Sequence, residues 1–324
     1  MRRVLGLVLT GLGAFLLALA LLLRFYLPGQ VVKFPLNEYL VTTLTGHNVT
    51  YFNAKQLRVL TGVTAKATST VEGDVSAGSS STAVWNDFTA VEDTTNNAPI
   101  EFVSERSAFN RRTGTIVDCC GAYVSISNVG TRDGHQSGQG FVWPLGTQKQ
   151  TYQVFDAMLG KPEPFRYEGT STIDGITAYK FVERVINQQF ASQTLPGSLV
   201  GYSSLPSVTL PEYATQINTV WVDPATGAPL DETENRTLRL EDITGATKLI
   251  LYSGDLASTP QSIASAVNTA NSAHLKVELV EDIGPLAGLI LGVGLVVVGV
   301  ALILDRRGSE EFAYESDETV GSTR

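Results

Sequence analysis

Two long uncharged segments, one near each end of the chain, most strongly constrain what this sequence can fold into. Residues 4–23 and residues 283–304 contain no ionisable side chain. At a helical rise of about 1.5 Å per residue, each segment spans roughly the 30 Å hydrocarbon core of a bilayer. The first segment could instead be a cleaved signal peptide, but it exceeds the apolar core of such peptides, which is about 7–15 residues long. We therefore expect two transmembrane helices.

The arginine pairs at positions 2–3 and 306–307 stand at the outer ends of these segments. Because cytoplasmic flanks of membrane helices are enriched in Lys and Arg, both termini are expected in the cytoplasm. A short N-terminus (1–3) and an acidic tail (305–324) would then lie inside a cell membrane that the chain crosses twice. Residues 27–282 would form one extracytoplasmic region.

Both segments carry small residues at helical spacing. Gly6 and Gly13 lie on one face of the first segment, and Gly288 and Gly292 form a GxxxG motif in the second. Small residues let helix backbones approach closely. The two helices can pack on each other, or each can pack on a second copy in a homo-oligomer through Gly288 and Gly292.

The extracytoplasmic region is predicted to be mainly β. Apolar and polar residues alternate with a period of two at 152–156, 176–185, 218–223 and 237–243, and more weakly at 65–73. A turn pattern of Asn or Asp, three residues and Gly recurs at Asn110–Gly114, Asp156–Gly160 and Asp223–Gly227. An Asn or Asp side chain can cap such a turn, and Gly supplies positive φ. These hairpins predict an antiparallel meander.

One helix is expected outside the membrane, over about 260–282. Thr259 or Ser258 can cap it, and Pro260 suits its first position. Its apolar stripe would pack on the sheet, which makes His274 a core histidine with a satisfied partner. The predicted fold class is therefore an antiparallel α+β, mainly β domain with one packed helix, flanked by two transmembrane helices.

Cys119 and Cys120 are the chain's two cysteines, and they are adjacent. Asp118 and Gly121 flank them in the pattern of a type I turn. Outside the cytoplasm disulfides persist, so a bridge between the two is one interpretation; paired free thiols and intermolecular bridges are the others. A bridge between neighbours closes almost no loop and is expected to stabilise little.

An unusually apolar stretch with three prolines covers residues 194–213. A solvated loop rarely exposes so much apolar surface, so the stretch either covers the core or lines an apolar pocket. If a pocket exists, its hydrophobic lip is predicted from the large side chains of Leu195, Leu199, Tyr202, Leu205 and Val208.

The residues that carry chemistry elsewhere are sparse. The three histidines are far apart and do not follow metal-ligand spacing, and no nucleophile or phosphate-loop motif is present. A net charge of −9 excludes a general nucleic-acid binder. We therefore expect no enzyme activity, no catalytic residue, no metal and no cofactor.

Several blocks carry a family resemblance: RRVLGLVLTGLGAFLL, RFYLP, FNRRTGTIVDCCG, GFVWPLGTQKQTYQVFD and DGITAYKF. Together with the glycine-rich second segment they resemble the actinobacterial porin PorA family of membrane proteins. The resemblance covers nearly the whole chain and implies a location in the cell envelope of an actinobacterium. The family's name implies a pore.

Two weaker resemblances concern architecture alone. The WVDPATGAPL hairpin is similar to hairpins of LolA- and RseB-like domains, whose curved sheets bind acyl chains. Two terminal anchors around a β-rich domain resemble the class B scavenger receptors. We therefore predict a tethered envelope protein that binds or transfers a lipid or other hydrophobe. The alternatives are a porin-like pore and a non-catalytic scaffold or signalling protein, whose cue is the acidic tail with its Ser and Thr residues.

Overall fold

The computed structural model describes residues 2–26, 32–279 and 283–304. The predicted tail at 305–324 and the last residues of the predicted helix at 280–282 lie outside the described residues. The described residues form two compact units, a terminal unit of 2–26, 32, 275–279 and 283–304 and a central unit of 33–274.

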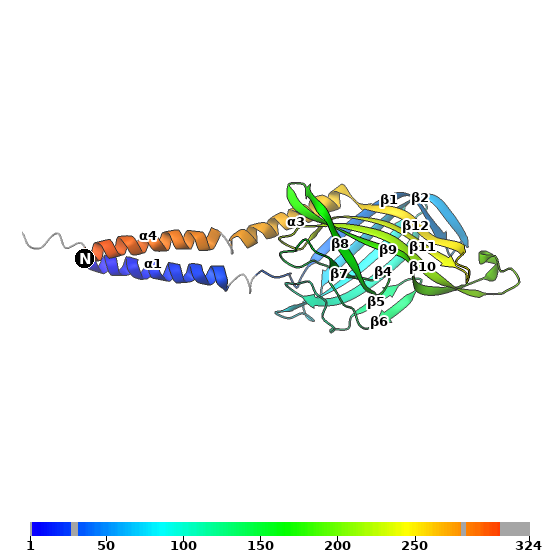
Figure 1. The fold of residues 1–324 in the computed structure, drawn as a ribbon, viewed down its shortest axis with the longest axis horizontal. Helices are drawn as coiled ribbons and strands as arrows, with labels where there is room; N and C mark the ends of the chain where they lie inside the picture. Colours follow the sequence, from blue (N-terminus) through cyan, green and yellow to red (C-terminus); the bar gives the residue numbers. More distant parts are fainter. Residues whose placement is uncertain (1, 27–31, 280–282, 305–324) are drawn as a thin grey trace, which may run out of the picture. The chain divides into compact units, whose positions relative to one another are not determined.

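The central unit is a curved antiparallel sheet of twelve strands (Figure 1). Its first six strands are β1 Tyr39–Asn53, β2 Arg58–Gly73, β3 Thr82–Asp93, β4 Ala98–Asn110, β5 Tyr123–Ile126 and β6 Gly130–Asp133. The other six are β7 Tyr152–Asp156, β8 Lys161–Ile173, β9 Ile176–Leu195, β10 Val208–Val222, β11 Pro229–Glu241 and β12 Thr247–Ser258. A short 3₁₀ helix, η1 Gly197–Val200, lies in the β9–β10 connection.

The strands form two meanders that meet in the middle of the sheet. The order is β6-β5-β4-β3-β2-β1-β12-β11-β10-β9-β8-β7, so β1 pairs with β12 and joins the first half to the second. The predicted antiparallel meander is confirmed. The predicted strands at 65–73, 152–156 and 176–185 lie within β2, β7 and β9, whereas those at 218–223 and 237–243 run one and two residues past the ends of β10 and β11. β9 is twice as long as its predicted core because it continues to Leu195.

The two ends of the sheet are linked to each other, which bends it into a half-barrel. Gln139 forms one isolated bridge with Thr115 and another with Val154 of β7. Arg132 of β6 donates through Nη1 to Met158 O at 2.7 Å and through Nη2 to Phe190 O at 3.0 Å. These contacts tie the β6 edge to the β7–β8 turn and to β9.

The recurring turn motif has the geometry that its residues predict. Asp223 Oδ1 accepts from Ala225 N at 3.1 Å, while Gly227 N donates to Asp223 O at 2.8 Å with a φ of 69° at Gly227. The turns at Asn110–Gly114 and Asp156–Gly160 repeat this pattern, with φ of 67° at Gly114 and 70° at Gly160. In each turn the leading side chain satisfies backbone N–H groups that the reversal leaves unpaired.

The helix that follows the sheet, α3 Pro260–Glu278, packs its first three turns on the central unit. Ser262 N donates to the capping Thr259 Oγ1 at 3.2 Å. Val267 and Ala270 are buried against Ile176 and Leu230 of the sheet. The predicted core histidine has its partner, because His274 Nε2 lies 2.7 Å from Asp223 Oδ2, in the turn that Asp223 caps.

The terminal unit contains the helices α1 Arg2–Phe25 and α4 Gly284–Leu304, both long and apolar enough to cross a membrane. They pack on each other through their small residues. An added Cβ on Gly6 would lie 2.7 Å from Gly299 O, and one on Gly13 would lie 2.7 Å from Gly292 O. The small residues of α1 and α4 thus pack on each other within one chain. A homo-oligomer through Gly288 and Gly292 stays a prediction.

Candidate functional site

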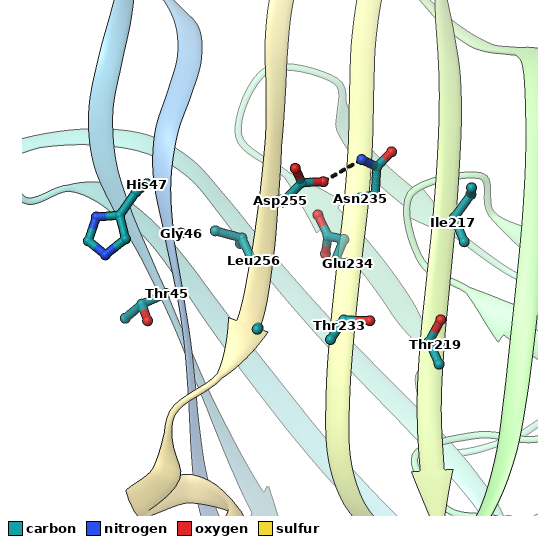
Figure 2. A pocket seen from close by; sticks show the side chains of 11 residues that line it. Thr45, Gly46, His47, Ile217, Thr219, Thr233, Glu234, Asn235, Asp255 and Leu256 are labelled. Atoms are coloured by element: carbon teal, nitrogen blue, oxygen red, sulfur yellow. Dashed lines mark hydrogen bonds between the residues drawn. The ribbon is translucent and has the colours of Figure 1, made fainter.

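A hollow of about 530 Å³ with a mixed polar and apolar lining lies on the outer face of the sheet, where β1, β12, β11 and β10 run side by side (Figure 2). It is lined by Thr45, Gly46, His47, Ile217, Thr219, Thr233, Glu234, Asn235, Asp255, Leu256 and Ala257. Glu234 and Leu256 pair with each other across β11 and β12, and by strand alternation their side chains belong to the opposite, inner face. The β1–β12 ladder shifts register between Thr45 and Thr50, which indicates a β-bulge beside the hollow. Gly46 is required there, because a Cβ on it would collide with the carbonyl oxygen of Asp255.

The inner face of the sheet differs in chemistry, since it buries carboxyl groups among apolar side chains. At its centre Arg236 Nη2 lies 3.0 Å from Glu101 Oε2, and Arg236 Nε lies 2.9 Å from Glu234 Oε1. The guanidinium also lies 4.9 Å from the centre of the Tyr252 ring. Burial alone lowers the pKa of Arg236, but the two carboxylates outweigh it and hold that pKa above its usual range.

A second part of this network joins two carboxyl groups through amides. Gln216 Nε2 donates to Glu183 Oε2 at 3.0 Å and also to Asp156 Oδ2, and Asn218 Nδ2 donates to Glu183 Oε2 at 2.6 Å. Burial, reinforced by the charge of Asp156, raises the pKa of Glu183 to about 8. Within the described residues, Glu183 Oε1 and Asn218 Oδ1 have no hydrogen-bond partner. Glu183 is therefore protonated at neutral pH.

Three further carboxyl groups have raised pKa values, those of the buried Glu105 and Glu212 and of the half-buried Glu232. Burial raises the pKa of Glu105, Glu212 and Glu232 to about 7 each. No group of three or more His, Cys, Asp or Glu side chains suited to a metal ion occurs in the part of the chain that the structure describes. The interior is therefore a proton-holding polar network within a packed core.

The predicted hydrophobic lip lies at one end of the sheet, in and beside η1. Four of its five residues, Leu195, Leu199, Tyr202 and Val208, pack half-buried around the buried side chains of Val200, Leu210 and Leu240. The fifth, Leu205, is 47% exposed. The structure brings the first four together in one apolar cluster, so the stretch covers part of the core and also presents apolar surface to its surroundings.

Cys119 and Cys120 lie in an exposed turn beyond the end of β4, with their sulfur atoms in bonding contact. Cys120 has a φ of 67°, and its carbonyl oxygen accepts from Arg106 Nε at 2.9 Å. His135 Nδ1 lies 2.7 Å from Asp118 Oδ2 beside the turn. The two cysteines lie in a turn, but the predicted type I geometry is wrong, because a type I turn needs a negative φ at Cys120. The redox state of the pair stays a prediction.

Sequence reasoning missed both the hollow and the inner network. Part of the network could be read from the sequence. Glu101, Glu183 and Arg236 stand at the inward positions of strands whose residues alternate between the two faces of the sheet. Asp and Glu that are scattered along strands ordinarily lie at a solvated surface, however, so these positions do not stand out in the sequence. The hollow could not have been found, because its four strands come from opposite ends of the region between the two helices.

Comparison with known proteins gives a class and then a family. The curved antiparallel sheet and the two apolar helices define a β-rich protein of the membrane or cell envelope. Residues 5–301 match the family described as Porin PorA, and the chain belongs to that family.

Other comparisons add little. No curated protein matches the chain. Among solved structures, a β-barrel-like protein of the domain of unknown function DUF1849 from Brucella abortus is similar over 68% of this chain and 96% of its own, at 13% identity. The TM-score of that match is 0.17, so it carries no argument.

Proposed function

We propose that this protein is a membrane-tethered component of the cell envelope whose central unit binds or hands on a lipid or another hydrophobe. The observation that carries the proposal is the apolar cluster around η1, with Leu205 exposed at its rim. Burial of apolar surface is favourable at about 25 cal/mol per Å², so a hydrophobe gains by covering this rim. The protein acts as a binding protein and not as an enzyme.

The binding place is the β9–β10 end and not the inside of the sheet. The inner face carries Glu183, Glu212 and Arg236, and an acyl chain would leave such groups without polar partners. The η1 connection is held by few backbone bonds, such as Tyr202 N to Gly197 O at 2.7 Å and Leu205 N to Tyr202 O at 2.9 Å. It can therefore lift from Leu240 and Leu249 with little loss of ladder hydrogen bonds.

A triple variant, Leu199→Ser, Tyr202→Ser and Leu205→Ser, tests this place. Each fully buried side chain contributes roughly 1.5–3 kcal/mol of apolar contact, so the full-length variant should lose most of its affinity for a fluorescent fatty acid. The matched control changes Val75, Phe88 and Ile186 to Ser, because these side chains are exposed and lie outside the η1 cluster. Equal binding by both triple variants would place the hydrophobe elsewhere, and unfolding of the first would assign its residues to the core.

The proposal includes a topology with both termini in the cytoplasm and the central unit outside. Its support is the arginine pairs at 2–3 and 306–307, the second of which lies outside the described residues. Reporter fusions at Gln150 and Arg324 should report opposite compartments. The same compartment at both positions would refute the two-pass arrangement.

A pore is the second candidate, and the family description favours it. A membrane-spanning barrel needs an outward apolar belt. The outer face of β1–β3 instead carries polar residues such as Thr43, Lys66 and Glu92. Conductance of the full-length protein in planar bilayers separates the two candidates, because a tethered binding protein should give no unitary steps.

A further inference from the structure

The hollow on the outer face is built from two transverse rows of side chains. In the first row Thr45 pairs with Ala257, Ala257 with Thr233, and Thr233 with Thr219, across four strands. In the second row Asp255 pairs with Asn235 and Asn235 with Ile217. His47 stands next to this second row at the bulge of β1 (Figure 2). At a strand spacing of about 4.8 Å, the first row is roughly 14 Å long and the second roughly 10 Å.

The three threonines of the first row offer free hydrogen-bonding capacity. Among the described residues, the hydroxyl groups of Thr45, Thr219 and Thr233 make no side-chain hydrogen bond, although Thr219 is only 8% exposed. A hydroxyl both donates and accepts, so these groups suit a ligand that does the same. The neighbouring side chains are already oriented, since Asn235 Nδ2 donates to Asp255 Oδ1 and His47 Nδ1 lies 3.1 Å from Thr64 Oγ1.

The lining excludes the other usual occupants of such a hollow. No Lys or Arg lines it, and the carboxylate of Asp255 stands in it, so an anion is disfavoured. An added peptide strand needs a free sheet edge, whereas β1, β12, β11 and β10 are each paired on both sides. A hydrophobe would cover three threonine hydroxyls without replacing their hydrogen bonds to water.

We propose that this hollow binds a neutral saccharide. The hydroxyls of Thr219 and Thr233 exchange hydrogen bonds with sugar hydroxyls, and the Asp255–Asn235 pair presents a fixed acceptor and donor beside them. Ile217 and Ala257 supply the small apolar area on which the C–H face of a sugar ring rests. The volume of about 530 Å³ lies within the usual range for small-ligand sites, and the length of the rows suits a short chain of sugar units. The site is separate from the η1 cluster and does not depend on hydrophobe binding.

The test uses the full-length protein in lipid nanodiscs, because the sugar headgroups of glycoside detergents would compete. An array of neutral gluco-, manno- and galacto-oligosaccharides identifies the preferred chain, which is then titrated in solution. Loss of two hydroxyls in the double variant Thr219→Val, Thr233→Val should weaken binding about tenfold or more, at the usual strength of neutral hydrogen bonds. Valine keeps the shape and the branching at Cβ, so the strands should remain intact.

Thr68→Val is the matched control, since Thr68 lies on β2 outside the hollow. It should bind as the unchanged protein does, and a double variant with Ser at positions 219 and 233 should regain most of the affinity. Asp255→Asn gives an independent measurement if the valine variant fails to fold, and it should also weaken binding. The proposal is overturned if no neutral oligosaccharide binds, if sulfated glycans bind better than neutral ones, or if the folded valine variant binds unchanged.

Discussion

The two units of the chain bury opposite kinds of residue. In the terminal unit the buried positions of α1 and α4 include Gly6, Gly13 and Gly299, while the large leucines and valines face outward. In the central unit Glu183 and Glu212 are almost fully buried, while threonines occupy much of the outer face. Each arrangement is unfavourable in the other's surroundings.

The contrast identifies the solvent of each unit. Apolar side chains that point outward are stable in hydrocarbon, where close backbone packing and not apolar burial holds helices together. Buried carboxyl groups require water outside and internal partners, or protons, inside. Hydrocarbon around the terminal helices and water around the sheet satisfy both, which is what a tethered envelope protein requires.

Removing the central cation should have the largest effect on the water-facing unit. Arg236→Met leaves Glu101 and Glu234 buried without their ion contacts. Breaking a buried pair by removing one partner costs about 3–5 kcal/mol, and urea unfolding should show a loss of this size. Arg184→Met, which removes the exposed pair with Glu168, is the control and should cost less than 1 kcal/mol. Similar losses in both variants would mean that the inner network contributes no more than the surface does.

The pH dependence of stability should be the next largest effect. The raised pKa values of Glu183, Glu105 and Glu212 mean that the folded state holds protons that the unfolded state releases above about pH 4.5. Stability is therefore fully present below pH 4.5 and is lost as the pH rises towards 7–8. The pKa of Asp74 is instead lowered, to about 2, so this carboxylate contributes stability that is lost only as the pH falls from 3.8 towards 2.

Glu183→Gln should flatten this curve. The amide cannot ionise, so the variant avoids the loss of stability that accompanies ionisation of Glu183 as the pH rises to 8. At pH 5 the variant and the unchanged protein should melt alike. A melting temperature that is independent of pH between 5 and 8 in the unchanged protein would contradict the protonated interior.

A change in the membrane-facing unit should have a smaller effect and leave the sheet unaffected. Gly13→Val places side-chain atoms against Gly292 O and Val296, and overpacking of this kind costs about 1–3 kcal/mol. Gly11→Val is the matched control on the same helix, because an added Cβ there meets nothing within 4 Å. Distance measurements between spin labels on α1 and α4 in nanodiscs should show separation for Gly13→Val alone. Separation in both variants would indicate a general loss of helicity.

Local sequence signals predicted much of this architecture. The two apolar helices, the antiparallel meander, the start of α3 at Pro260 and three capped turns follow from contiguous patterns. Two more turns of the same kind were missed, because Leu57 and Asn97 hold positive φ where the pattern requires Gly. The capping residues Asn53 and Asp93 were the available signal, since each accepts backbone N–H groups as the predicted caps do.

The candidate sites were less predictable because they depend on long-range pairing. The hollow combines Thr45 of β1 with Asp255 of β12, which lie at opposite ends of the central unit in sequence. The inner network pairs Arg236 with Glu101, 135 positions apart. The predicted lip came from composition over one contiguous stretch, so its clustering could be anticipated, although its ligand could not.

The smallest effect is expected at the water-facing turn of Cys119 and Cys120. We predict that they form an intramolecular bridge, because the two thiols are neighbours in a turn and the central unit is expected in an oxidising compartment. Thiol labelling without reductant should give little adduct, whereas full labelling of both residues would rule the bridge out. The double variant Cys119→Ser, Cys120→Ser should lose less than about 1 kcal/mol, because the bridge closes almost no loop and Arg106 still bonds the backbone carbonyl at position 120. A larger loss would show that the turn supports more of the sheet than its exposure indicates.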